Sequence, residues 1–72
     1  MMQYGLTPRQ TQVFKFIKSY ISKKGYSPSY EEIAKANNMK TKSHVSQIIV
    51  KLEQRKWITR IPGTSRSINI LK

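Results

Sequence analysis

The side chains that could carry catalytic chemistry are few in this 72-residue chain. The carboxylates are Glu31, Glu32 and Glu53, and the one histidine is His44. An acid/base pair, a nucleophilic triad or a multi-ligand metal site needs several such groups at one point. The glycines are also too far apart for a loop that holds a nucleotide phosphate. We therefore expect no enzyme activity, no catalytic residues, no cofactor and no metal site.

Small polar side chains between positions 41 and 47 offer a second kind of chemistry. Hydroxyl, imidazole and amide groups of this size can hydrogen-bond the edges of DNA bases. The residues concerned are Thr41, Ser43, His44, Ser46 and Gln47. The same side chains would also suit a solvated helix, so alone they leave base readout and an ordinary helix surface equally open.

The charge balance favours a polyanionic partner. Lys and Arg number 14 against 3 acidic residues, which gives a net charge of +11. Such one-sided charge repels itself in a folded protein and attracts DNA, RNA, an acidic membrane or an acidic protein. No apolar run approaches the ~20 residues of a membrane span, and no signal-peptide pattern opens the chain. We expect no membrane contact and a cytoplasmic location, in the bacterial cytoplasm or nucleoid, or in the host cytoplasm if a phage encodes the chain.

Three helices are expected to position these groups, and the first should span about 8–23. Thr7 and Gln10 can form a capping box around Pro8 at its start. Apolar side chains then recur on one arc of the helix, with Phe14 at the edge of that arc. The arc holds Val13, Phe16, Ile17, Tyr20 and Ile21. This spacing favours a core role for the aromatic rings over base stacking.

A short second helix is expected at about 30–37. Ser29 and Glu32 can form another capping box, and an acidic first turn suits the positive end of a helix dipole. The helix should turn Ile33, Ala34 and Ala36 inward and end at Asn37 and Asn38, where asparagine tolerates a left-handed conformation.

The third helix is expected at about 42–55, with Thr41 as its cap. Its buried stripe should be formed by Val45, Ile48, Ile49 and Leu52. The polar residues between positions 41 and 47 would then lie near its N-terminal end, away from that stripe.

The remaining segment, about 57–71, is expected to form a β-hairpin. Strand-forming residues occupy 57–61 and 67–71, and the dipeptide Pro62-Gly63 suits the centre of a type II turn. Arg66 would lie at the tip of the hairpin, with Arg60 nearby on its first strand.

These elements predict a mainly α fold with a small β-hairpin, a winged helix-turn-helix in which residues 1–72 form a single domain. In such a domain the third helix enters the major groove and the hairpin follows the DNA backbone. Sequence preference would come from the polar residues between positions 41 and 47. Phosphate contacts would come from Ser29, Tyr30, Lys40, Lys42 and Lys51. Wing contacts would come from Arg60, Thr64, Ser65 and Arg66.

The chain resembles the N-terminal DNA-binding domain of LexA-type repressors, and it aligns with the family pattern without a gap from Leu6 to Leu71. The resemblance rests on three stretches. They are Leu6-Thr7-Pro8-Arg9-Gln10 with Val13-Phe14 and Ile17, the run Gly25…Pro28…Glu32-Ile33-Ala34, and Gly63-Thr64-Ser65-Arg66-Ser67-Ile68. It implies a sequence-specific bacterial-type transcriptional repressor that occupies an operator in double-stranded DNA.

Two departures from the family limit what the resemblance implies. Where the family typically has Ser-Pro-Asn-Ala-Ala-Glu-Glu, this chain has Thr41-Lys42-Ser43-His44-Val45-Ser46-Gln47, so the usual operator sequence is not inferred. The family also continues into a self-cleaving dimerisation domain. A natural chain ending at Lys72 is expected to lack self-cleavage, and this architecture would suit a phage or mobile-element regulator.

Two other functions stay open at this point. The domain could act mainly through a protein partner, by capturing a host repressor or a polymerase. It could also be a non-specific architectural or RNA-binding protein, although its aromatic residues fall on core stripes rather than on a stacking surface. A weak homodimer on DNA is a further open alternative, with Val50 and Trp57 as contributors, while Trp57 fits the core or the base of the wing better.

Overall fold

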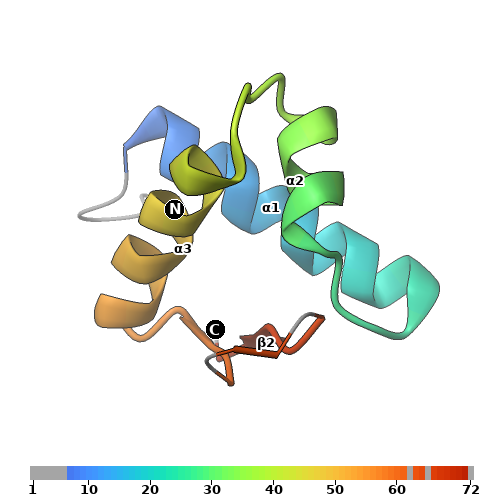
Figure 1. Cartoon of the computed structure of the whole chain (residues 1–72). Coiled ribbons are helices and arrows are strands. Elements are labelled where there is room, and N and C mark those ends of the chain that lie inside the picture. Colours follow the sequence, from blue (N-terminus) through green and yellow to red (C-terminus); the bar gives the residue numbers. More distant parts are fainter. Residues whose placement is uncertain (1–6, 62, 65, 72) are drawn as a thin grey trace.

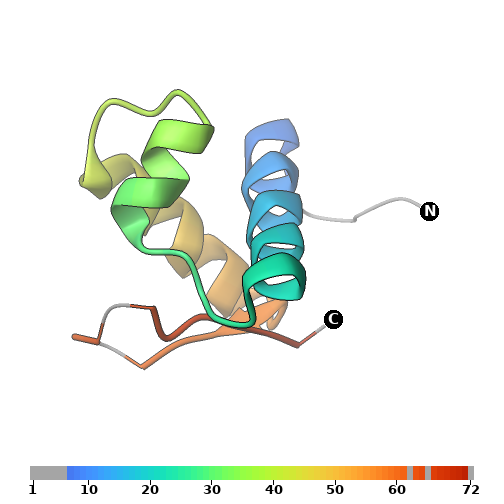
Figure 2. The same cartoon turned by 90° about the vertical axis from the view of Figure 1, so that its right-hand side faces the viewer.

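The fold is mainly helical with a small antiparallel hairpin, and this confirms the winged helix-turn-helix class. The computed structural model describes residues 7–61, 63–64 and 66–71. The element order is α1 (Pro8–Lys24), α2 (Tyr30–Ala36), α3 (Lys42–Gln54), β1 (Ile58–Thr59) and β2 (Asn69–Ile70). Figure 1 shows α2 and α3 joined by a loop at one end, and Figure 2 shows the hairpin beneath the helices. Within the described ranges, none of the helices is long and apolar enough to cross a membrane.

Each helix begins where a side chain caps its free amides. In α1 the Thr7 hydroxyl accepts from the Gln10 backbone N–H, and the Gln10 side chain accepts from the Thr7 backbone N–H. In α2 the Ser29 hydroxyl and the Glu32 side chain form the same reciprocal pair. Thr41 caps α3 by accepting from the backbone N–H of His44. Gly25 ends α1 at φ 81°, a left-handed conformation that glycine adopts without a Cβ clash. Against the expected bounds, α1 is one residue longer at its C-terminal end, and α2 and α3 are each one residue shorter.

The core lies where the three helices meet the base of the hairpin. Its buried side chains are Val13, Phe14, Ile17, Ile33, Ala34, Met39, Val45, Ile48, Ile49, Leu52, Ile58 and Ile68. Phe14 is among them, although the helical arc places it at the edge. The inward placement of Ala36 was wrong, because α2 ends there and leaves that methyl exposed.

The turn between α2 and α3 is fixed by one buried asparagine. The Asn37 side chain donates to the Ile33 carbonyl oxygen at 2.8 Å and accepts from the Gln12 amide at 3.0 Å. Arg9 donates to the Asn37 carbonyl oxygen at 2.8 Å. These bonds tie the start of α1 to the C-terminal end of α2, where the turn begins.

The hairpin pairs Ile58 with Ile70 and Thr59 with Asn69. At its base the Trp57 ring packs edge-on against Phe14, with centroids 5.1 Å apart, which places Trp57 at the base of the wing. Near the tip, Thr64 N–H donates to the Ile61 carbonyl oxygen at 3.2 Å, and Gly63 has φ 77°, as the third position of a type II turn requires. The expected turn residue Pro62 lies outside the described residues.

Candidate nucleic-acid interface

The polar residues that the sequence singled out lie on the exposed side of α3, on its two flanks and at its cap. Val45, Ile49 and Leu52 are buried against the body of the domain, which turns Ser43 and Gln47 to the opposite, exposed side. His44 is exposed on one flank of that side, and Ser46 is half-buried on the other. Thr41 is exposed, with its hydroxyl used in the cap of α3.

A groove of about 320 Å³ lies on the wing side of α3. It is lined by Ser29, Tyr30, Glu31, Lys42, Arg60, Gly63 and Thr64. The start of α2, the start of α3 and the hairpin therefore bring five of the expected backbone and wing residues together. The Ser29 amide and hydroxyl are used in its capping box, and Arg60 donates to Glu53 at 3.1 Å.

A second groove of about 250 Å³ lies on the other flank of α3, against the start of α1. It is lined by Thr7, Arg9, Gln10, His44, Gln47, Ile48 and Lys51. The sequence-based site contained His44, Gln47 and Lys51 but omitted the cap residue Thr7 and the α1 residues Arg9 and Gln10. Their cap pattern marked them as a helix start, and only the packing of α1 on α3 brings them to the same groove.

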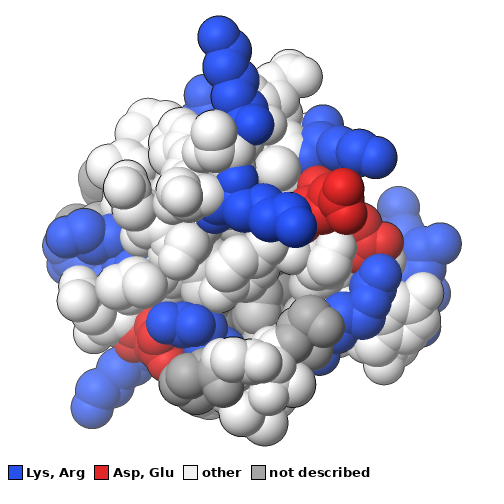
Figure 3. Space-filling model, in the orientation of Figure 1, with Lys and Arg blue, Asp and Glu red and all other residues white. Residues whose placement is uncertain are grey.

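The face that Figure 3 shows is rimmed and crossed by lysine and arginine side chains, and acidic atoms lie beside some of them. Lys40, Lys42 and Lys51 are exposed to solvent. The exposed polar side of α3 thus lies between two grooves that both contain cationic side chains. Cations on both flanks of a helix suit a polyanion that passes over it.

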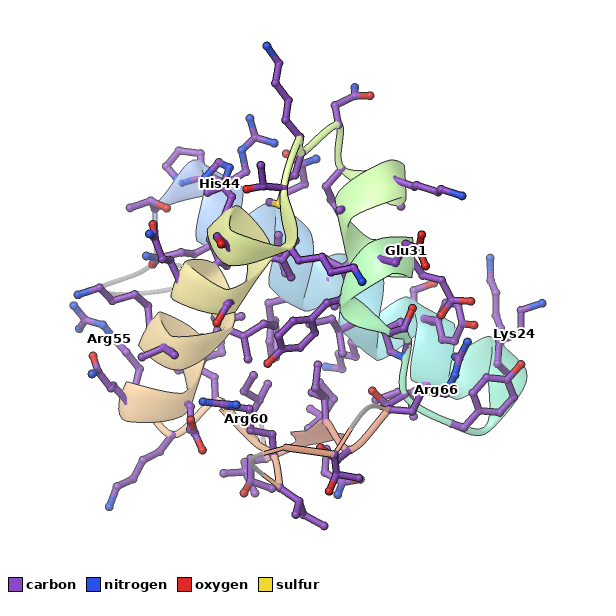
Figure 4. The ribbon with its side chains drawn as sticks, viewed as in Figure 1. Lys24, Glu31, His44, Arg55, Arg60 and Arg66 are labelled. Carbon is purple, nitrogen blue, oxygen red and sulfur yellow. The ribbon has the colours of Figure 1, made fainter. Side chains whose placement is uncertain are left out.

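Arg66, like Arg60, pairs with a glutamate of the same chain, and it makes further contacts with the body of the domain. Figure 4 shows it between the hairpin and the C-terminal end of α1. Its Nη1 and Nη2 atoms lie 2.9 and 3.0 Å from the two carboxylate oxygens of Glu32. Nη1 also donates to the Ser27 carbonyl oxygen at 3.1 Å. Thr64 is exposed near the tip, and Ser65 lies outside the described residues.

The Arg66 guanidinium, together with the Ser29 backbone N–H, lowers the pKa of Glu32 from its ordinary value of 4.5 to about 2. A lowered carboxyl pKa in the folded state stabilises the fold above the ordinary pKa, and that contribution is lost as the pH falls toward the folded pKa. We expect Glu32→Gln to lower the thermal unfolding midpoint at neutral pH. The difference from the unchanged protein should shrink between about pH 4.5 and pH 2.

Thermal unfolding followed by circular dichroism across that range tests this expectation, with Glu31→Gln as the matched loss of one charge from the same helix turn. A difference between Glu32→Gln and the unchanged protein that stays constant down to pH 2 would show that the carboxylate charge contributes nothing to stability.

Comparison with known proteins adds a family assignment to this geometry. The model of the LexA DNA binding domain matches residues 3–67. The LexA repressor of Clostridium kluyveri is 44% identical over 64 residues, which cover 89% of this chain and 32% of that protein. The LexA repressor of Erythrobacter litoralis is 40% identical over 67 residues, covering 93% of this chain and 29% of that protein. The chain therefore spans about a third of the length of the curated relatives it matches.

Proposed function

Because the chain belongs to the LexA DNA-binding domain family, we propose that it binds double-stranded DNA sequence-specifically, as a small LexA-like transcriptional regulator that represses by occupying an operator. The observation that carries this proposal is the exposed polar side of α3, which lies between two grooves that contain cationic side chains. The role proposed is binding, not catalysis.

In this proposal the N-terminal half of α3 lies in the major groove. Ser43 and Gln47 face away from the core and reach the base edges, while His44 and Ser46 contact the flanking positions. Gln47 contributes most to the discrimination between bases, since its amide can both donate to and accept from an adenine edge. Thr41 contributes mainly by capping the helix that holds them.

The phosphate backbone passes along the two grooves. On the wing side the phosphates contact Lys42, Arg60 and Thr64. On the α1 side they contact Lys51 and also Arg9, which the sequence-based site did not include. Lys40 in the preceding turn extends the same line of positive charge. These contacts fix the position of α3 on the duplex but carry no sequence information.

Lys51→Gln should weaken binding to every duplex by a similar factor and reduce the salt dependence of binding by about one phosphate contact. Fluorescence anisotropy with a labelled duplex, titrated at several salt concentrations, measures both quantities. Lys15→Gln is the matched control, because Lys15 lies on α1 opposite Val13 and Ile17 and makes the same change of charge. Equal losses of salt dependence in the two variants would contradict a phosphate contact by Lys51.

A further inference from the structure

The carboxylate of Glu32 accepts hydrogen bonds from three different segments of the chain. One oxygen accepts from the Ser29 backbone N–H at 2.9 Å, inside the capping box of α2. The same oxygen accepts from the Tyr20 hydroxyl of α1 at 3.2 Å. Arg66 from the hairpin pairs with both oxygens. This one side chain therefore connects α1, α2 and the wing.

Arg66 also contacts groups other than Glu32. The Arg66 guanidinium carbon lies 5.3 Å from the centroid of the Tyr26 ring, within cation–π range. Tyr26 packs edge-on against Tyr20, with centroids 5.8 Å apart, and the Ser27 carbonyl oxygen accepts a further bond from Arg66. The guanidinium thus contacts a carboxylate, a carbonyl oxygen and an aromatic face of the body of the domain, while the Arg66 side chain stays 41% exposed.

Arg66 also has an unusual backbone conformation. Its φ is 55°, in the left-handed region that a long L side chain seldom occupies. A surrounding structure that holds such a residue must supply compensating contacts. The ladder pairs in the described hairpin lie at its base, between residues 58–59 and 69–70, and the contacts of Arg66 with the body of the domain lie at the opposite end.

We propose that Glu32, with Tyr20, Tyr26 and the Ser27 carbonyl, forms a latch that holds Arg66 and so sets the position of the wing relative to α3. Arg66 is then a positioning residue. The latch rests on the proposed DNA binding for its purpose, since α3 and the wing must engage one duplex together. The competing role is the one expected from the sequence, in which Arg66 itself binds phosphate.

Glu32→Gln separates the two roles because it keeps the fold of α2. Glutamine at this position can still complete the capping box, but it lacks the charge that holds Arg66. Loss of the latch should free the hairpin tip. At the tip, the Ile61 N–H donates to the Ser67 hydroxyl and the Thr64 N–H donates to the Ile61 carbonyl oxygen. These two amides should exchange their hydrogens several-fold faster, while the Leu71 amide at the base keeps its exchange rate. Unchanged exchange at the tip would overturn the latch, whether or not the protein binds DNA.

The effect on DNA binding has opposite signs under the two roles. The latch predicts that Glu32→Gln binds a duplex more weakly than the unchanged protein, although the substitution removes a negative charge. The latch also predicts that the double variant, with Arg66→Gln and Glu32→Gln, binds a duplex no more weakly than Arg66→Gln alone. Either substitution by itself already removes the pairing of Arg66 with Glu32. If Arg66 binds phosphate, its release should make Glu32→Gln bind more tightly than the unchanged protein, with a salt dependence steeper by about one contact. That result would overturn the latch, whereas failure of the unchanged protein to bind any duplex would count against the proposed function.

Discussion

Gln47→Ala is expected to remove most of the preference for a specific duplex over random DNA while leaving non-specific binding almost unchanged. Gln47 is exposed at the centre of the side of α3 that faces away from Val45, Ile49 and Leu52. A well-placed bidentate contact to a base discriminates by about 1–3 kcal/mol, so the ratio of specific to random affinity should fall between about fivefold and 150-fold. Ser43→Ala should act in the same direction with a smaller effect, because a hydroxyl makes one contact to a base edge.

Competition binding of each variant, with a selected duplex against random-sequence DNA, measures this ratio. Lys51→Gln is the comparison, since a phosphate contact should weaken both duplexes alike and leave the ratio near its original value. Full discrimination by both Gln47→Ala and Ser43→Ala would show that α3 does not read the sequence through these side chains.

Leu52→Ala is expected to have the largest effect on stability. Leu52 is fully buried in the hydrophobic core, on the inward side of α3. Replacing a buried leucine with alanine costs about 2–5 kcal/mol, because the lost apolar burial is joined by the cost of the cavity. A domain this small has a free energy of unfolding near the lower end of the usual range of about 5–15 kcal/mol. Leu52→Ala should therefore populate the unfolded state measurably without denaturant.

Urea unfolding followed by circular dichroism gives the free energy directly, and Val50→Ala is the matched control on the same helix. Val50 is half-buried on the other side of α3, so its truncation should cost well under half as much. Equal costs for the two variants would mean that the stripe through Leu52 is not the part of α3 that holds it to the domain.

The local elements were predictable because their causes are local. The capping boxes of Thr7 with Gln10 and Ser29 with Glu32 lie within four consecutive residues, and both form as expected. The left-handed conformation of Asn38 follows from its residue type, and its φ is 56°. The stripe of α3 is buried as its spacing predicts. Errors at helix ends, such as the exposed Ala36, are of the size that frayed ends produce.

The parts of the site that the sequence did not reveal depend on contacts between distant residues. Asn37 is marked by its type only as a helix stop, and its bonds to Arg9 and Gln12 require α1 to lie beside the turn. Arg66 is 34 residues from Glu32 and 39 from Ser27, so no pattern along the chain predicts their contact. A basic residue in a hairpin is expected to serve a partner outside the protein, and only the packing shows that its partner here lies within the domain.

Selection of bound duplexes from a random DNA pool, repeated at about 50 and 200 mM salt, tests the central claim most directly, because phosphate contacts weaken steeply across that range. If α3 reads bases between two lines of phosphate contacts, one motif should be enriched and should persist at the higher salt. Its symmetry would show whether one or two copies of the domain occupy it. Recovery of no motif, with binding that disappears at the higher salt, would contradict sequence-specific recognition and leave only a general affinity for polyanions.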